Sequence, residues 1–328
     1  MRPYRLNRQT LAACAALVLA TPAAADEAPL SVLATVGMIG DVAQSVAGAC
    51  AQVATLMGPG VDPHDYSATP RDVDALAAAE LIFYVDRTLE ERLADVFDRF
   101  GDRTPTVGLA AASFGPSDLL DDPDAPSAMD PHLWMDVSRW ARIAPVIAEA
   151  IAEQRPDCAA EMEVNVAALQ AQLDALHRWV GEAIASIPEG RRILVTAHDA
   201  FYYFADAYGI EASEAIEGIS SAAEASISDI RDVADFVVAQ DVPAVFVETT
   251  INPRTIEALV VEVQSRGHAV AIGGELFSDA MGDDGSPEGT YIGMIRANTI
   301  TITDALGGSV PDWPEALHDW AARWDISP

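Results

Sequence analysis

The chain has 328 residues, is 50% apolar and carries a formal net charge of −32. The apolar content is high enough to bury a large core, which excludes an intrinsically disordered protein, and the length favours two domains over one. The strong negative charge repels nucleic acids and anionic membranes, so no nucleic acid is expected as a partner, but it describes the surface as a whole and identifies no site.

The first segment, residues 1–25, is predicted to be a signal peptide. Three arginines form its basic start, an apolar run follows from Leu11 to Ala20, and Ala23–Ala25 provides the small residues that a signal peptidase needs. The apolar run is too short for a confident membrane span. The mature chain would then begin at Asp26 in the periplasm, and the loss of three arginines and no acidic residue would take its net charge to −35.

The cysteines raise two questions about this exported chain. Cys14 lies inside the apolar run, whereas a lipidated cysteine follows such a run, so we do not expect a lipid anchor. Cys50 and Cys158 remain in the mature chain and permit a disulfide in an oxidising compartment. They are too far apart in sequence to judge their geometry, which leaves the pairing open.

Short apolar runs alternate with helical patterns along the mature chain. This alternation predicts an α/β fold with parallel sheets flanked by helices. The predicted helices include Met38–Ala47, Pro70–Ala79 and Ile227–Gln240, and Ser113–Met129 is expected to be a polar surface loop without histidine. The predicted strands are Ser31–Val36, Gln52–Met57, Leu81–Val85, Arg192–Ala197, Ala244–Val247 and Ala269–Ile272.

One predicted helix is much longer than the others. Apolar residues recur every three or four positions through residues 157–187, which is the helical period. At about 1.5 Å per residue this helix would extend about 45 Å, more than one small lobe needs. We therefore expect it to join two lobes, residues 26–156 and 188–328. The alternative is a long surface helix within a single domain.

Three histidines lie in contexts that suit ligands. His64 lies in a Gly- and Pro-rich loop after a predicted strand, and His198 ends another strand, where α/β proteins build their ligand sites. His132 follows Pro131, which fixes the backbone at the start of a helix, and the nearby Trp134 could close the apolar wall of a pocket. Taken singly, each histidine could equally be an exposed loop, capping or structural residue.

Asp279 also follows a predicted strand, by a short loop, although alone it could equally be a turn or capping residue. Three imidazoles and one carboxylate at the edges of different strands suit a tetrahedral Zn²⁺ site, so His64, His132, His198 and Asp279 are the predicted metal ligands. The same set could take Mn²⁺, although a shell richer in oxygen would suit that ion better. The remaining histidines have no such context and are not expected to be ligands: His177, His268 and His318.

Five stretches of the sequence together resemble the zinc/manganese solute-binding proteins of bacterial ABC importers. Their order and spacing match that family and span nearly the whole mature chain. The resemblance implies two α/β lobes of parallel sheet, joined by one long rigid helix, with the metal site between the lobes. The matching stretches are Gly58–Pro70, Asp130–Asp136, Thr196–Phe204, Ala244–Glu248 and Ser278–Asn298.

The resemblance also implies roles for the ligands and for the protein. His64 and His132 correspond to ligands from the N-terminal lobe, and His198 and Asp279 to ligands from the C-terminal lobe. The third position is His in zinc members and often Glu in manganese or iron members, so His198 favours zinc as the cargo. We expect a periplasmic monomer that delivers Zn²⁺ to an ABC permease, with a periplasmic metallochaperone as a second candidate partner.

The sequence departs from the family in two places. Many zinc members carry a long His-rich loop before the second ligand, whereas Ser113–Met129 is short, acidic and free of histidine, which puts loop-based metal recruitment in doubt. A fourth protein ligand at Asp279 also differs from members that leave this position to water.

Two other classes of protein remain as alternatives. A zinc hydrolase would need an acid or base beside the metal, and the candidates Asp65, Asp199 and Glu248 lie in no enzyme motif. A surface adhesin is the other alternative, because relatives in this family have been called adhesins. We expect a binding protein rather than an enzyme.

Overall fold

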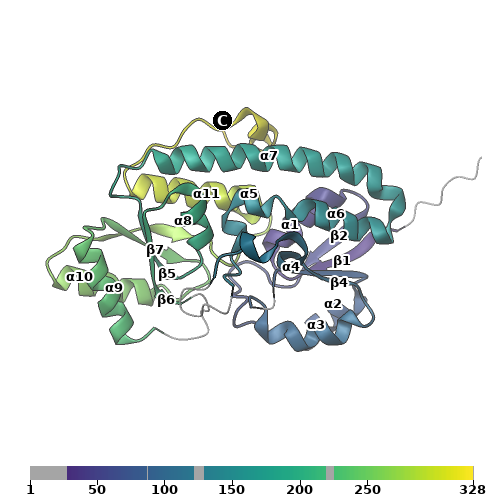
Figure 1. Ribbon diagram of the computed structural model, residues 1–328, viewed down its shortest axis with the longest axis horizontal. Helices are drawn as coiled ribbons and strands as arrows, with labels where there is room; N and C mark the ends of the chain where they lie inside the picture. The colour runs from purple at the N-terminus through teal and green to yellow at the C-terminus, as the bar shows by residue number, and fades with distance from the viewer. Residues whose placement is uncertain (1–27, 87, 122–128, 219–224, 328) are drawn as a thin grey trace, which may run out of the picture.

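The computed structural model describes residues 28–86, 88–121, 129–218 and 225–327. The predicted signal peptide and Cys14 lie outside these residues, as does part of the predicted loop Ser113–Met129. The described chain forms two α/β lobes with parallel strands in both, and the long helix α7 (Ala159–Ala185) runs along one edge of both lobes (Figure 1). The predicted fold class is therefore confirmed.

The N-terminal lobe contains a sheet of four parallel strands in the order β2-β1-β3-β4. The central strand β1 has an almost entirely buried sequence, as expected for a parallel strand covered by helices on both faces. Its strands are β1 (Leu30–Ala34), β2 (Ala51–Thr55), β3 (Leu81–Tyr84) and β4 (Thr106–Gly108). Its helices are α1 (Gly37–Ala47), α2 (Pro70–Ala78), α3 (Ala94–Gly101), α4 (Leu109–Ser113), α5 (Val137–Trp140) and α6 (Ile143–Gln154), with the 3₁₀ turn η3 (Leu133–Met135) before α5.

The C-terminal lobe contains two parallel strand pairs, β5-β6 and β7-β8, and β5 lies alongside β7. The strands are therefore arranged as one layer in the order β6-β5-β7-β8. These strands are β5 (Ile193–His198), β6 (Ala212–Glu217), β7 (Ala244–Glu248) and β8 (Ala271–Leu276). The helices are α8 (Tyr202–Tyr208), α9 (Ile227–Ala239), α10 (Arg254–Ser265), α11 (Tyr291–Ala305) and α12 (His318–Arg323).

Helix α7 packs against both lobes. It contacts α1 and α6 in the N-terminal lobe and α11 in the C-terminal lobe. Its 27 residues correspond to about 40 Å of helix, and its buried residues Leu169, Leu173, Leu176 and Val180 keep the predicted spacing of three and four. None of the described helices, including α7, combines the length and apolar character needed to cross a membrane.

One apolar cluster extends through both lobes and α7. It includes Met38 of α1, Leu173 of α7 and Ile295 of α11, all fully buried. A second apolar cluster lies in the C-terminal lobe, between its strands and the helices α9 and α10. Because the two lobes share a densely packed core, they are held at a fixed spacing, and this limits how far they can rotate apart.

Sequence reasoning located the strands but missed two of them. Its boundaries for β1, β2, β3, β5 and β7 are within two residues of those observed. It missed β4, which has three residues, and β6, whose sequence Ala-Ser-Glu-Ala-Ile-Glu contains little that favours a strand. It also ended the last strand at Ile272, because Gly273 and Gly274 interrupt the apolar run; the strand passes through them by a bulge opposite β7 and continues to Leu276.

The cysteine pairing that the sequence left open is settled by the structure. Cys50 and Cys158 form a disulfide, with their Cα atoms 6.1 Å apart. The bond connects the residue before β2 to the residue before α7, and both cysteines are buried. It therefore fastens the start of the long helix to the N-terminal sheet.

Replacing both cysteines by serine should lower the free energy of unfolding by roughly 2–4 kcal/mol, because the disulfide closes a loop of 108 residues in the unfolded chain. Denaturant unfolding of the mature wild-type protein and of the Cys50→Ser/Cys158→Ser variant would measure the difference. A reductant should destabilise the wild type and leave the variant unchanged. Equal stability of the variant and the wild type without reductant would contradict the prediction.

Candidate metal centre

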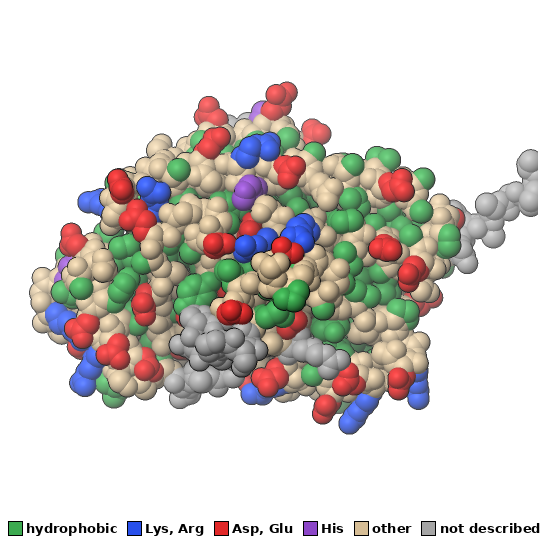
Figure 2. All heavy atoms as spheres, in the orientation of Figure 1, with side chains coloured by type: hydrophobic (Ala, Val, Ile, Leu, Met, Phe, Trp, Pro, Cys, Tyr) green, Lys and Arg blue, Asp and Glu red, His purple; other side chains and the backbone are tan. Residues whose placement is uncertain are grey.

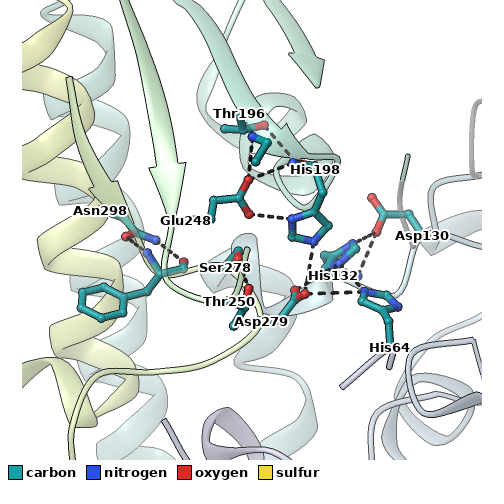
Figure 3. A network of polar contacts seen from close by, with 12 residues as sticks. His64, Asp130, His132, Thr196, His198, Glu248, Thr250, Ser278, Asp279 and Asn298 are labelled. Carbon is teal, nitrogen blue, oxygen red and sulfur yellow. Dashed lines mark hydrogen bonds and ion pairs between the residues drawn. The ribbon is translucent and has the colours of Figure 1, made fainter. Parts of the chain in front are cut away.

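Four side chains from four separate segments point toward one buried spot between the lobes (Figure 3). His64 lies in the loop after β2 and His132 immediately precedes η3, whereas His198 is the last residue of β5 and Asp279 lies in the loop after β8. Each is at most 4% exposed. The structure therefore brings together all four residues that the sequence proposed as ligands, two from each lobe.

One ligand atom from each of the four residues lies within 4.8 Å of the others, close enough for one metal ion to contact all four. His132 Nε2 lies 3.3 Å from Asp279 Oδ1, and His198 Nε2 lies 3.1 Å from Asp279 Oδ2. His64 Nε2 lies 3.6 Å from Asp279 Oδ2 and 3.3 Å from His132 Nε2. Four ligands at the usual Zn²⁺ bond lengths of about 2.0–2.1 Å are about 3.3 Å from one another. The residues present therefore fit a bound Zn²⁺ ion.

The same tripeptide, Asp-Pro-His, presents both histidines of the N-terminal lobe. The backbone N–H of His64 donates to Asp62 Oδ1 at 2.8 Å, and that of His132 donates to Asp130 Oδ1 at 2.9 Å. In such turns an aspartate side chain accepts a hydrogen bond from the backbone N–H two residues later, and this bond fixes the direction of the loop. The proline between the two residues removes a further degree of freedom.

Carboxylates hold the other ring nitrogen of two of the histidines (Figure 3). Asp130 Oδ1 lies 2.7 Å from His132 Nδ1, and Glu248 Oε2 lies 2.6 Å from His198 Nδ1. Glu248 Oε1 also accepts from the backbone N–H groups of Ala197 and His198, at 2.8 and 2.9 Å. A carboxylate beside Nδ1 places the ring proton there and leaves Nε2 as the metal ligand.

Sequence reasoning did not identify these two carboxylates as partners of the histidines. It treated Glu248 only as a candidate base for a hydrolase, and it quoted Asp130 only as part of a motif. The available signals were the position of Asp130 two residues before a ligand and the position of Glu248 at the carboxyl end of β7. The contact between Glu248 and His198 joins two strands that lie about 50 residues apart in sequence, so it depends on strand order.

The site binds protons in the absence of metal. Burial lowers the pKa of His132, but the charges of Asp130 and Asp279 outweigh it and raise the pKa to about 9. For His198 burial again opposes protonation, and Glu248 and Asp279 raise the pKa well above its usual value. Burial would raise the pKa of Asp279, but the two protonated rings hold it well below its usual range.

His64 behaves differently. Its pKa is lowered to about 3, because burial of the ring outweighs the attraction of Asp279. No carboxylate among the described residues lies beside its Nδ1, whereas Nδ1 of His132 hydrogen-bonds Asp130 and Nδ1 of His198 lies in ion-pair contact with Glu248. His64 is therefore a neutral imidazole at physiological pH, and it needs to lose no proton to bind a cation.

The other three histidines have separate partners. His177 Nδ1 lies 3.1 Å from the hydroxyl of Tyr208, and the rings of His268 and His318 contact backbone carbonyl oxygens. Among the described residues, the four residues of the buried site are the one group of clustered metal-ligating side chains. On the face shown in Figure 2, acidic side chains are spread over the surface rather than gathered in one patch.

The chain is similar to several known metal-binding proteins. The family model described as zinc-uptake complex component A, periplasmic (ZnuA), matches residues 32–305. The zinc-binding protein TroA of Treponema pallidum (strain Nichols) is 44% identical over 87% of this chain and 91% of its own length. The manganese-binding lipoprotein MntA of Bacillus subtilis (strain 168) is 36% identical over 84% of this chain and 90% of its own length.

A solved structure shows the same fold. The periplasmic zinc-binding protein TroA from Treponema pallidum superposes with a TM-score of 0.82 at 42% sequence identity. The match covers 85% of this chain and 99% of the solved chain. The two-lobe arrangement with one long helix is therefore similar in both proteins.

Metal affinity should rise with pH between about 6 and 8. Because His132 and His198 hold protons in the metal-free protein, a bound ion must displace them, and each released proton gives up to about a tenfold gain per pH unit. Zn²⁺ competition titrations at pH 6, 7 and 8 would measure this, together with the protons released into a weak buffer. An affinity independent of pH over this range would contradict the assignment of protons.

The variant Glu248→Gln should bind Zn²⁺ about 10–100-fold more weakly. The amide would still accept from the backbone of β5, but its NH₂ group would face His198 Nδ1 and favour the tautomer with a proton on Nε2. Glu217→Gln is the matched comparison, because Glu217 lies opposite His198 in the register of β5 and β6 and acts on its ring through charge alone, so it should cost less affinity than Glu248→Gln. A competition titration in which both variants lose the same affinity would contradict this role of Glu248.

Proposed function

The chain belongs to the family of periplasmic zinc-uptake components, the metal-binding proteins of ABC importers, and on that premise we propose that it captures Zn²⁺ and delivers it to a membrane permease. The observation that carries the proposal is the buried group of His64, His132, His198 and Asp279, which we propose as the four ligands. Three imidazole nitrogens and one carboxylate within 4.8 Å of one another are a donor set that suits tetrahedral Zn²⁺, and carboxylates lie beside two of the rings.

Transport explains this site better than catalysis does. A catalytic zinc ion keeps one position open for a reactive water, whereas four protein ligands occupy the whole tetrahedral shell. The candidate bases for a hydrolase also have other contacts: Glu248 faces His198, Asp199 accepts from the hydroxyl of Tyr202, and Asp65 forms an ion pair with Arg92. Adhesion is the other alternative class, and no feature of the described surface favours it.

Zinc is the proposed cargo, and Mn²⁺ or Fe²⁺ is the alternative. Three imidazole nitrogens and one carboxylate form a nitrogen-rich shell, which suits Zn²⁺, whereas Mn²⁺ prefers more oxygen. The 44% identical relative is named as zinc-binding and the 36% identical relative as manganese-binding. Because most sites bind Zn²⁺ more tightly than Mn²⁺, both ions must be compared in competition.

The organisation of the precursor follows from the same proposal. We place a cleaved signal peptide at residues 1–25, the N-terminal lobe at 26–156, the linking helix at 157–187 and the C-terminal lobe at 188–328. The observed bounds of α7, Ala159–Ala185, lie inside the proposed linking helix. The mature protein would act as a periplasmic monomer, with an ABC permease as its partner and a metallochaperone as a further one.

Removing any one ligand should weaken Zn²⁺ binding by roughly a hundredfold or more, because the binding free energy of about 10–16 kcal/mol typical of four-ligand zinc sites is shared among four bonds. The test is a competition titration of the demetallated mature protein with Zn²⁺ and Mn²⁺, beside His64→Ala, His198→Ala and Asp279→Ala. One tight zinc equivalent, weakened in every variant and with manganese weaker, is the expected result.

His177→Ala is the control for this experiment, because it removes an imidazole that contacts Tyr208 outside the four-residue group. It should leave the zinc affinity unchanged. Zinc binding that is untouched by the three ligand substitutions would show that the ligand set is wrong. Manganese binding as tight as zinc would show that the proposed cargo is wrong.

A further inference from the structure

A single hydrogen bond joins two ligand-bearing segments of opposite lobes. Trp134 lies two residues after His132, and its indole Nε1–H donates to the backbone oxygen of Ser278 at 2.8 Å. Ser278 immediately precedes Asp279. Both Trp134 and Ser278 are fully buried, so no water replaces this bond. The distance between the segments of His132 and Asp279 is therefore set by a direct contact.

Trp134 is held at a second point by the C-terminal lobe. The hydroxyl of Tyr291, the first residue of α11, donates to the backbone oxygen of Trp134 at 2.8 Å. The backbone N–H of Tyr291 in turn donates to Asp41 Oδ2 of α1, at 3.0 Å. The indole ring also packs edge-on against the imidazole of His132, with ring centroids 5.2 Å apart. Trp134 is therefore held on several sides, and it in turn packs against the ring of His132.

The acceptor of the indole is itself fixed. The hydroxyl of Ser278 lies 3.0 Å from that of Thr250, in the loop after β7 (Figure 3). Other hydrogen bonds cross between the lobes nearby, such as the one from the Tyr203 hydroxyl to the backbone oxygen of Asp130, but they come from α8 rather than from the segment of Asp279. Between the described residues of the His132 and Asp279 segments, the bond of Trp134 is the hydrogen bond that adds to the direct contact of the two proposed ligands.

We propose that Trp134 is a positioning residue that holds His132 and Asp279 in register for the metal before the metal arrives. The inference rests on the proposed metal-binding function. If the indole N–H were lost, the buried carbonyl of Ser278 would have no donor, and the two segments would be free to separate. Metal binding would then have to order them, and an ordering step of this kind lowers affinity.

The test is Trp134→Phe, which removes the N–H donor and keeps an aromatic ring against His132. The zinc affinity should fall about tenfold, with faster release of zinc to a chelator. Trp140→Phe is the matched control. Trp140 is also fully buried, its ring lies 6.2 Å from that of Trp134, and its indole nitrogen has no hydrogen-bond partner among the described residues. Its zinc affinity should change by less than about twofold.

The thermal midpoint of each metal-free protein separates positioning from stability. If both variants lose stability and both keep the wild-type zinc affinity, the role of Trp134 is structural only and the inference is overturned. If the wild type itself binds no zinc, the proposed function fails first. Should Trp134→Phe not fold, Tyr291→Phe decides, because it removes the second tie to Trp134; an unchanged zinc affinity in that variant would also overturn the inference.

Discussion

The buried negative charge of Asp279 is the constraint on which the rest of the site depends. Its carboxylate lies among three imidazoles at the point where the two lobes meet. An unpaired carboxylate in such a place would be very costly, so a positive charge must always accompany it. Protons on His132 and His198 supply that charge in the metal-free protein, and a metal cation would supply it in the loaded one. Because either can satisfy the same carboxylate, a metal ion bound as proposed would exchange with protons within one arrangement of side chains.

The fold brings the four groups together by simple means. The carboxyl ends of parallel strands meet at one edge of each sheet, and three of the four ligands follow such ends. The two edges face each other because α7 and a shared apolar core hold the lobes together. A ligand set drawn from two lobes on a rigid frame is preorganised, and this reduces the ordering that binding requires. The contact of Trp134 with the neighbour of Asp279 acts in the same direction.

Much of this could be predicted from the sequence, for identifiable reasons. His64 and His198 follow predicted strands, where ligand sites of α/β proteins lie, so local pattern marks each as a candidate. Their meeting across the two lobes was implied by the family resemblance. The spacing along α7 likewise predicts the long helix. Asp130 and Glu248 were missed as partners of histidines because a buried carboxylate cannot be told from an exposed one in sequence, and only the order of β5 and β7 places Glu248 beside His198. The end of β8 was missed for a similar reason. The strand continues past Gly273 and Gly274 only because it pairs with β7, and this pairing is not visible in the local sequence.

A crystal structure of the mature protein loaded with one equivalent of Zn²⁺, with anomalous scattering measured at the zinc edge, would show the proposed ligands directly. We expect one strong peak, about 2.0–2.1 Å from the Nε2 atoms of His64, His132 and His198 and from an oxygen of Asp279. A peak bound elsewhere, or one in which Asp279 is replaced by water, would contradict the central claim that these four side chains form the complete shell of the metal.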